Sequence, residues 1–319
     1  MASYETYGGN FILPHPYEVK KVTGYGVALG GNKAKLKALV NAKLNPLANQ
    51  SLRYHLVSST VLFTFMRMGR MACAGHPEMG SFSERELNVA LLLVAVDGPS
   101  IRLVWYMPYL WLDSGPALIA GRDIYGFPKQ SADVEIPHLG QEAKFSATAE
   151  VLHRDDGQPA VLGVILSADR VARGVLRKRS MTTKANEALA TLGTFFHLDT
   201  GALANLGLTV PHLNLGSLKM VFMRQHPSIS NCKRACFRSV AEVPFTVTLR
   251  SAGLLAGSYQ VSIPYHHSVK LAHELGIAKD VLVPGKPGKD VTIRAKAAYH
   301  MDFDFILGKG RDLWVEYER

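Results

Sequence analysis

Stretches that favour β-strands, separated by turn signals, recur along almost the whole chain, and this pattern restricts the fold more than any other feature of the sequence. They lie at 57–65, 83–96, 100–113, 145–153, 160–168, 217–224, 245–250, 259–263, 291–307 and 313–318. Pro108 interrupts the third of them. Because strands do not alternate regularly with helices, the pattern predicts an α+β fold. In this fold a mainly antiparallel or mixed sheet folds on itself and has a few flanking helices.

Few segments have the period of a helix. Asn32 can cap a helix that continues to about Asn45, just before Pro46. The apolar residues of this segment recur at helical spacing, at Leu36, Leu39, Val40 and Leu44. Two further helices are predicted at 181–197 and at 268–277, the second with Ser268 as its cap.

The first thirty residues differ in composition from the rest of the chain, because they are rich in Gly, Pro and Tyr. We expect residues 1–30 to form an N-terminal arm that packs on the core, and GYGVALGG at 24–31 to make turns. The remainder shows no internal repeat and no linker. Residues 31–319 are therefore predicted to form a single domain.

The bulk composition is that of a folded globular protein, since 47% of the 319 residues are hydrophobic and 19% are charged. No apolar run approaches the roughly 18 residues of a membrane span, and the N-terminus lacks the apolar segment of a signal peptide. Three cysteines do not make a disulfide framework, which favours a reducing compartment. We therefore expect a cytoplasmic protein without a membrane partner.

The net charge of +10 raises the question of nucleic-acid binding. The basic residues are spread along the chain, however, and their small groups are not interleaved with aromatic residues as a stacking surface requires. We therefore expect no nucleic-acid partner and interpret the charge as a basic, solvated surface.

Metal and nucleotide motifs are weak. The histidine-rich segment YHHSVKLAHE (265–274) does not match H-E-x-x-H, and CKRAC (232–236) has no second cysteine pair. The Gly/Lys-rich segments GGNKAK and PGKPGKD do not fit a phosphate-binding loop, and a G-x-S-x-G elbow is lacking. We therefore predict no metal and no cofactor.

The segment GRDIYGFPKQ (121–130) places a lysine where a charged group is least expected. Gly121 and Gly126 punctuate it, Pro128 fixes the backbone just before Lys129, and Phe127 is pushed toward extended geometry by that proline. Removing a lysine from water disfavours its ammonium form and so increases the fraction of neutral, nucleophilic amine. The residues alone leave an alternative open, in which Lys129 is a surface lysine that extends its amine to water at a strand end.

The run WLDSGPALIAGRDIYGFPKQ (111–130) resembles the signature of the acetoacetate decarboxylase family, which reads YLD…PAIA.GRE..G[FY]PKK. Nine residues stand in register, namely Leu112, Asp113, Pro116, Ala117, Ala120, Gly121, Arg122, Pro128 and Lys129. The resemblance implies that Lys129 forms a Schiff base with a keto substrate. It also implies a sheet closed into the barrel-like fold of that family. Weaker likeness extends over most of 60–319.

A second family segment, which carries an acidic residue, resembles SFSERELNVALLL (81–93). Glu84 takes the place of that acid, and we expect it to transfer protons, with Glu86 as a rival. On a strand these two glutamates share one face, and Arg85 points to the other.

Three departures from the family pattern alter the charges around the lysine. The family's second lysine is Gln130 here, so a neighbouring ammonium is missing. The family's earlier glutamate should fall within 62–70, where Thr64 or Met66 stands. Its N-terminal arginine should fall near 20–24, where the chain has Lys20, Lys21 and Val22.

Three residues near the lysine are predicted to contact substrate. Gln130 can hydrogen-bond a carboxylate or carbonyl, and Phe127 and Arg122 complete the predicted set. We expect Arg122 to brace the loop through Asp113 or Asp123 in preference to contacting the substrate.

The sequence thus predicts a Schiff-base-forming lyase that acts on a small keto acid, with β-keto acid decarboxylation as the family's default reaction. Two alternatives stay open. The same lysine could serve aldol or dehydration chemistry, or the fold could bind a small ligand without catalysis. Extra length at the N-terminus and around 170–215 suggests a reshaped pocket or an oligomer contact, and we expect a homo-oligomer.

Overall fold

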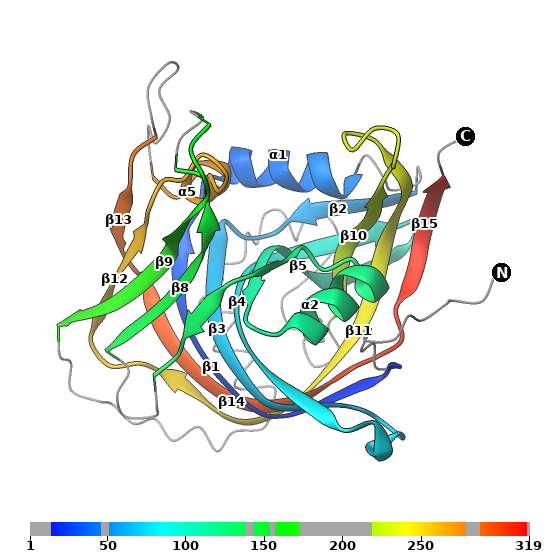
Figure 1. Ribbon diagram of the computed structural model, residues 1–319, viewed down its shortest axis with the longest axis horizontal. Coiled ribbons are helices and arrows are strands. Elements are labelled where there is room, and N and C mark those ends of the chain that lie inside the picture. The colour runs from blue at the N-terminus through cyan, green and yellow to red at the C-terminus, as the bar shows by residue number, and fades with distance from the viewer. Residues whose placement is uncertain are drawn as a thin grey trace.

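Two β-sheets and a few short helices make up the structure, which is a computed structural model (Figure 1). It describes residues 14–45, 51–137, 143–153, 157–172, 219–278 and 288–317. The larger sheet has the strand order β2-β4-β3-β1-β14-β11-β10-β5-β6, with β15 paired to β11 and β5 also paired to β4. The smaller sheet has the order β13-β12-β9-β8-β7. The prediction of a mainly antiparallel or mixed sheet is confirmed, because among the described pairings only β5–β10 and β5–β6 are parallel.

The strands have the following bounds. Those of the larger sheet are β1 Tyr17–Gly30, β2 Leu52–Leu56, β3 Thr60–Cys73, β4 Ser81–Asp97, β5 Ser100–Leu112, β6 Lys129–Ser131, β10 Lys219–Pro227, β11 Ala235–Leu254, β14 Ala297–Leu307 and β15 Arg311–Tyr317. Those of the smaller sheet are β7 Asp133–Glu135, β8 Lys144–Val151, β9 Val161–Ala172, β12 Ser258–Ile263 and β13 Val291–Arg294. Each predicted strand overlaps one of these, although 245–250 is only the middle of β11 and 291–307 is divided between β13 and β14.

The first predicted helix is confirmed as α1 (Lys33–Lys43), with the Asn32 side chain accepting hydrogen bonds from the first turn. The prediction for 268–277 is wrong in its start, because α5 covers only Leu271–Leu275 and follows Lys270, which provides no side-chain cap. The Ser268 hydroxyl instead accepts a hydrogen bond from the Leu152 N–H, 3.0 Å away. The helix predicted at 181–197 lies outside the described residues. The remaining helical segments are α2 (Gly115–Ala120), a single π-helical turn (Gly121–Tyr125) and a short 3₁₀ turn (Pro77–Met79).

The expectation of an N-terminal arm and of turns at 24–31 is wrong from Tyr17 onwards. Residues Tyr17–Gly30 form β1, which pairs with β3 on one side and with β14 on the other. Gly26 is one of the glycines that suggest a turn, but its role is different. A Cβ there would lie 2.2 Å from the ring of Tyr299. This glycine makes room for an aromatic ring on the adjacent strand and does not form a turn.

Pro108 does not end β5, although it interrupts the sequence pattern. Val89 pairs with Tyr109 and Leu91 with Tyr106, so β5 has one more residue than β4 between these two pairs. Such a bulge places a residue outside the regular ladder, where the missing N–H of proline costs no hydrogen bond. The strand therefore continues through the proline toward the segment that holds Lys129.

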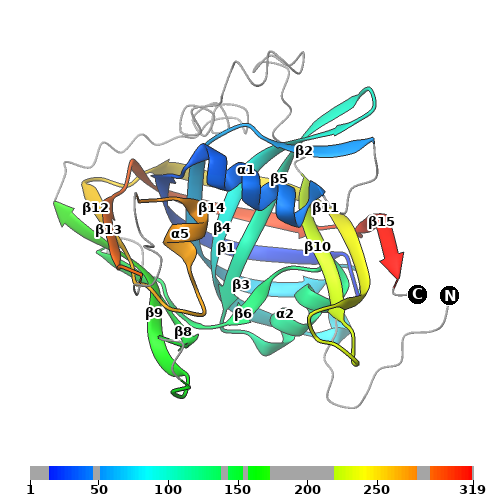
Figure 2. The same ribbon diagram turned by 90° about the horizontal axis from the view of Figure 1, so that it is seen from above.

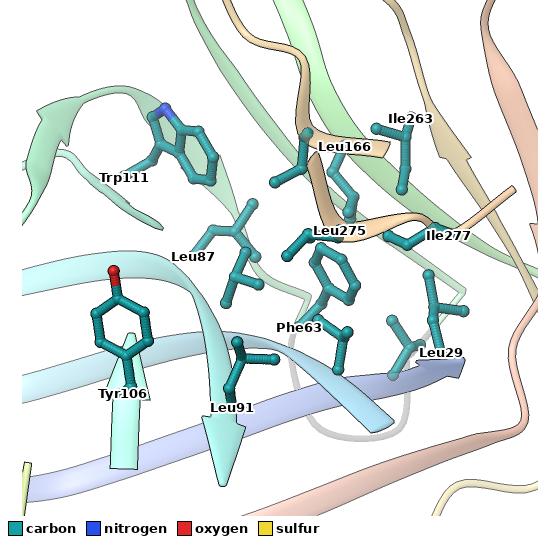
Figure 3. Packing of buried hydrophobic residues seen from close by; sticks show 14 of the residues in the cluster. Leu29, Phe63, Leu87, Leu91, Tyr106, Trp111, Leu166, Ile263, Leu275 and Ile277 are labelled. Carbon is teal, nitrogen blue, oxygen red and sulfur yellow. The ribbon is translucent and has the colours of Figure 1, made fainter. Parts of the chain in front are cut away.

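The larger sheet buries both faces. On one face Leu29, Phe63 and Leu87 pack against Leu166 of the smaller sheet and Leu275 of α5 (Figure 3). Burying each such side chain stabilises the fold by about 1.5–3 kcal/mol. The other face carries a second cluster rich in methionine and phenylalanine, and the charged residues described next lie beside it. None of the helices in the described ranges has the length and the apolar character that crossing a membrane requires.

Candidate active site

The segment that presents Lys129 follows directly from the end of β5. The Ser114 hydroxyl caps α2 by accepting a hydrogen bond from the Ala117 N–H, and α2 continues into the π-helical turn. Phe127 N–H then donates to the Gly121 carbonyl at 3.0 Å, which closes the segment on itself. Lys129 begins β6, which lies parallel to β5. The chain thereby leaves the helical turn in a fixed direction just before the lysine.

Two glycines in this segment are required by close contacts. Gly121 lies against the lysine side chain, because a Cβ there would be 2.7 Å from Lys129 Cδ. Gly126 has a φ of 75°, and a Cβ there would be 2.5 Å from Arg224 Cα on β10. Left-handed backbone with no room for a side chain suits only glycine. The lack of side chains at these two glycines thus lets the segment pack closely against the side chain of Lys129 and against the backbone of β10.

Lys129 is buried between two carboxyl groups. Its side chain is 5% exposed, and its Nζ lies 3.5 Å from Glu84 Oε1 and 3.8 Å from Glu86 Oε2. The ring of Phe127 is 5.5 Å from the same nitrogen, measured to the ring centroid. Lysine and glutamate side chains are seldom buried to this extent unless they are paired, and withdrawing such a pair from water costs free energy.

The two glutamates come from β4 and share a face of the larger sheet, as strand alternation predicts. Both side chains are buried, whereas Arg85 between them is exposed. Arg85 binds Asp113 through an ion pair of 3.0 Å between Nε and Oδ2. The expectation that Arg122 braces the loop through Asp113 or Asp123 is therefore wrong, because Arg85 occupies the Asp113 carboxylate and Arg122 pairs with neither aspartate within the described ranges.

Glu86 has the more strongly perturbed environment. Burial raises the pKa of its carboxyl to about 7, against the opposing effect of Lys129 and with a further increase from the negative charge of Glu84. The buried Asn88 amide donates a hydrogen bond of 3.2 Å to Glu86 Oε1. A carboxyl group with this pKa can both donate and accept a proton near neutral pH.

Glu84 is held by fewer contacts than Glu86. Neither of its carboxylate oxygens has a hydrogen-bond partner among the described residues, and both atoms are inaccessible to solvent. Its contact with Lys129, at 3.5 Å, is an ion pair without hydrogen-bond geometry. A carboxylate in this position is free to accept a hydrogen bond or a proton from the lysine amine beside it.

Methionines occupy the positions opposite these glutamates on β3. Met68 pairs with Glu84 and Met66 pairs with Glu86. No acid from this strand segment therefore joins the site. On β1, Val22 is buried near these methionines, whereas Lys20 is exposed and paired with Glu18 at 2.9 Å. Within the described ranges, Lys129 is the only cation paired with either glutamate.

Gln130 does not share the lysine's face. It pairs with Trp111 of β5, which belongs to the core on the opposite side of the sheet, whereas Lys129 pairs with Leu110 of the methionine-rich cluster. Gln130 is also exposed. The contacts of the lysine amine with the two glutamates therefore do not involve Gln130.

A groove of about 1680 Å³ reaches Lys129 from outside the sheet. It is bordered by α1, β5, the π-helical turn, β10, β11 and β15, which can be followed in Figures 1 and 2. Phe127, Gln130 and Arg122, the residues predicted to contact substrate, all line it, and their role stays a prediction. Glu84 and Glu86 do not line it, so Lys129 stands at the inner end of the groove with both carboxyl groups behind it.

Sequence reasoning missed two parts of this arrangement. Asn88 continues the alternation of Glu84 and Glu86, so the same strand pattern could have placed it beside them. The groove wall formed by the β10–β11 hairpin had no such signal, because this wall is more than ninety residues away from the lysine in sequence.

Comparison with known proteins identifies the family of the chain. The family model described as "Acetoacetate decarboxylase (ADC)" matches residues 8–193, and the chain belongs to this family. The match, together with the similar structures, supports lyase-type enzyme activity. No curated protein sequence matches the chain significantly.

Solved structures of this family share the fold at low sequence identity. The acetoacetate decarboxylase of Legionella pneumophila subsp. pneumophila str. Philadelphia 1 is 14% identical, with 98% of each chain covered and a TM-score of 0.59. A structure from structural studies of acetoacetate decarboxylase is 14% identical, covering 97% of this chain and 93% of that chain, with a TM-score of 0.56. The enduracididine biosynthesis enzyme MppR complexed with pyruvate is 12% identical, covering 96% and 93%, with a TM-score of 0.53.

Proposed function

We propose that this chain is a Schiff-base-forming lyase that decarboxylates a β-keto acid through an imine on Lys129. The observation that carries the proposal is the position of the Lys129 amine, which is buried within 3.5 and 3.8 Å of two carboxyl groups at the inner end of a groove. An amine in this position can meet a carbonyl compound while acid and base groups stand beside it.

Imine formation needs one base and one acid. Glu84, the closer carboxylate, accepts the proton that the lysine must lose before its lone pair attacks the ketone carbon. The attack forms a C–N bond and a carbinolamine. Glu86 in its protonated form donates a proton to the carbinolamine hydroxyl, and the C–O bond then breaks with loss of water. The product is a protonated imine.

The protonated imine then withdraws electrons from the neighbouring bond. The bond to the carboxylate carbon breaks, CO₂ leaves, and the electron pair becomes the enamine double bond. A carboxyl group beside Lys129 returns a proton to the enamine carbon, and water hydrolyses the resulting imine to release the ketone. Overall one proton is taken up from solvent, because the substrate carboxylate leaves as neutral CO₂, and this proton restores the protonated form of Glu86 for the next cycle.

A second candidate reaction is aldol-type condensation or dehydration on the same lysine. It is favoured by Thr64 and Met66, one of which stands where the family pattern has an acid, and by Val22 and Lys20, which supply no cation to the site. One structural neighbour, MppR, has been solved with the condensation product of pyruvate and imidazole 4-carboxaldehyde. In this reaction the enamine attacks an aldehyde carbon in place of taking up a proton.

The proposal also includes a barrel-like closure of the larger sheet. It is supported by β5, which pairs with β10 on one side and with β4 on the other, so that the strand order returns to β4.

The two reactions are separated by supplying the purified chain with acetoacetate and longer β-keto acids, and separately with pyruvate and an aldehyde. The proposal expects CO₂ release from at least one β-keto acid and loss of this activity in Lys129→Arg. Condensation products without CO₂ release would establish the second candidate instead. Release of CO₂ that persists in Lys129→Arg would contradict an imine on this lysine.

A further inference from the structure

The groove that ends at Lys129 is much larger than a small keto acid needs. Its volume is about 1680 Å³, whereas pockets for drug-sized ligands are typically about 300–1,000 Å³. A molecule the size of acetoacetate would occupy a small part of it. The groove can therefore hold a considerably longer substrate whose carbonyl reaches the lysine at the inner end.

The wall of the groove nearest to Lys129 is apolar. Phe127 and Phe222 are in contact, with ring centroids 4.2 Å apart. Tyr106 and Met223 also line the groove. Aromatic and thioether side chains favour a hydrocarbon segment over water. A part of the substrate that extends from its ketone along Phe127 and Phe222 is thus expected to be apolar.

The lining of the groove carries an excess of positive charge even apart from Lys129. Five basic side chains line it, against three acidic ones, which are Asp123, Glu274 and Glu316. The basic residues are Lys43, Arg122, Lys233, Arg234 and Arg238. Glu274 already accepts a hydrogen bond from the Tyr109 hydroxyl. The groove therefore attracts an anion more strongly than a neutral molecule.

Two of the arginines have N–H groups that are available to bind a ligand. Arg122 is exposed and forms no ion pair within the described ranges. It directly follows Gly121, where a Cβ would lie 3.3 Å from Lys129 Nζ, so its backbone is close to the amine. On β11, the Arg238 Nε is buried and lacks a hydrogen-bond partner among the described residues.

From these features we infer that the substrate is a keto compound with an anionic group separated from its ketone by an apolar segment. The ketone meets Lys129, the segment lies along Phe127 and Phe222, and the anion binds Arg122 and Arg238. This anionic group is separate from the carboxylate that a β-keto acid loses as CO₂ beside Lys129. This inference rests on the proposed imine and specifies the substrate class for it.

Stable methyl ketones test the inference, because imine formation requires only the carbonyl. The full chain is incubated with borohydride and either levulinate, which carries a carboxylate remote from its ketone, or methyl propyl ketone, which has the same carbon chain without it. The pair is then repeated with longer homologues. The rate of covalent labelling is followed by intact mass, and acetoacetate is included as a reference.

The inference predicts that at some chain length the oxo acid labels Lys129 at least about tenfold faster than its neutral partner at equal low concentration, since hydrogen bonds to a charged group are the strong ones. Arg122→Gln and Arg238→Gln should each reduce this preference, measured as the ratio of the two labelling rates within the same variant. Lys37→Gln, which removes a positive charge from an exposed position of α1 outside the groove, should leave the preference unchanged.

The outcomes separate the two proposals. Labelling by acetoacetate together with equal rates for every matched pair would overturn the substrate class and leave the imine intact. A preference that survives both arginine substitutions would also overturn it. Absence of labelling by every ketone and keto acid would contradict the proposed imine itself.

Discussion

At the scale of single residues, the proposed mechanism depends on a lysine and two glutamates that are almost fully removed from water. Moving one such charge into the interior without a partner costs several kcal/mol. Lys129 offsets part of this cost for Glu84 and Glu86, but one cation cannot balance two ionised carboxyl groups. The raised pKa of Glu86 is the consequence, because protonation of this group removes one of the two negative charges.

The stability of the fold should therefore depend on pH through Glu86. The pKa of Glu86 is about 7 in the folded chain, against 4.5 ordinarily, so the folded state holds more protons between these values and stability falls as pH rises through them. The decline can reach about 3 kcal/mol. Glu86→Gln should remove most of it, as measured by urea unfolding at about pH 5 and about pH 8.

The control for this measurement is Glu150→Gln, which removes a carboxyl group from an exposed position of β8 and should keep the wild-type decline. Equal pH dependence in wild type and Glu86→Gln would contradict the raised pKa.

Glu84 is expected to matter for rate more than for stability. Glu84→Gln removes the base nearest to the amine, and the loss of a general base typically reduces turnover by a factor of about 10² or more. The reduction should appear in kcat for CO₂ release and in the rate of imine trapping. Unchanged rates in both assays would exclude Glu84 as the proton acceptor and point to Glu86.

At the scale of elements, strand alternation on β4 is sufficient to predict that Glu84 and Glu86 share a face and that Arg85 does not. Sequence reasoning fails for β1, because Gly26 suggests a turn. The ring that occupies the space beside it belongs to Tyr299, which is remote in sequence. The cap of α1 is local and was predictable from Asn32. Local signals could be read from the sequence, whereas close approaches between distant strands could not.

The π-helical turn that covers Lys129 depends on Gly126. Gly126→Ala should destabilise the chain by at least about 2 kcal/mol, because the alanine adds left-handed strain and a clash with the backbone of Arg224. Gly157→Ala is the matched control. It has nearly the same φ, 74°, but open space at its Cβ, so it should cost only about 1–2 kcal/mol of strain. Equal costs in denaturant unfolding would show that the contact with β10 is unimportant.

At the scale of the whole molecule, the position of Lys129 combines contributions from distant parts of the chain. β5 and β6 place its backbone, β4 provides the two carboxyl groups, and the β10–β11 hairpin forms one wall of the groove. The motif at 111–130 identified the lysine from the sequence, but it contained no information about the size or charge of the groove. That information depends on pairings such as β5–β10, which join segments more than a hundred residues apart.

The most direct test of the account is to trap the imine. The chain is incubated with acetoacetate and borohydride, the intact mass is measured, and the modified peptide is mapped. The account predicts a single adduct on Lys129, with the mass of an isopropyl group if decarboxylation precedes reduction, and its absence in Lys129→Arg and Lys129→Met variants that keep the wild-type circular dichroism. An adduct that persists in those variants, or the absence of any adduct with every keto acid tried, would contradict it.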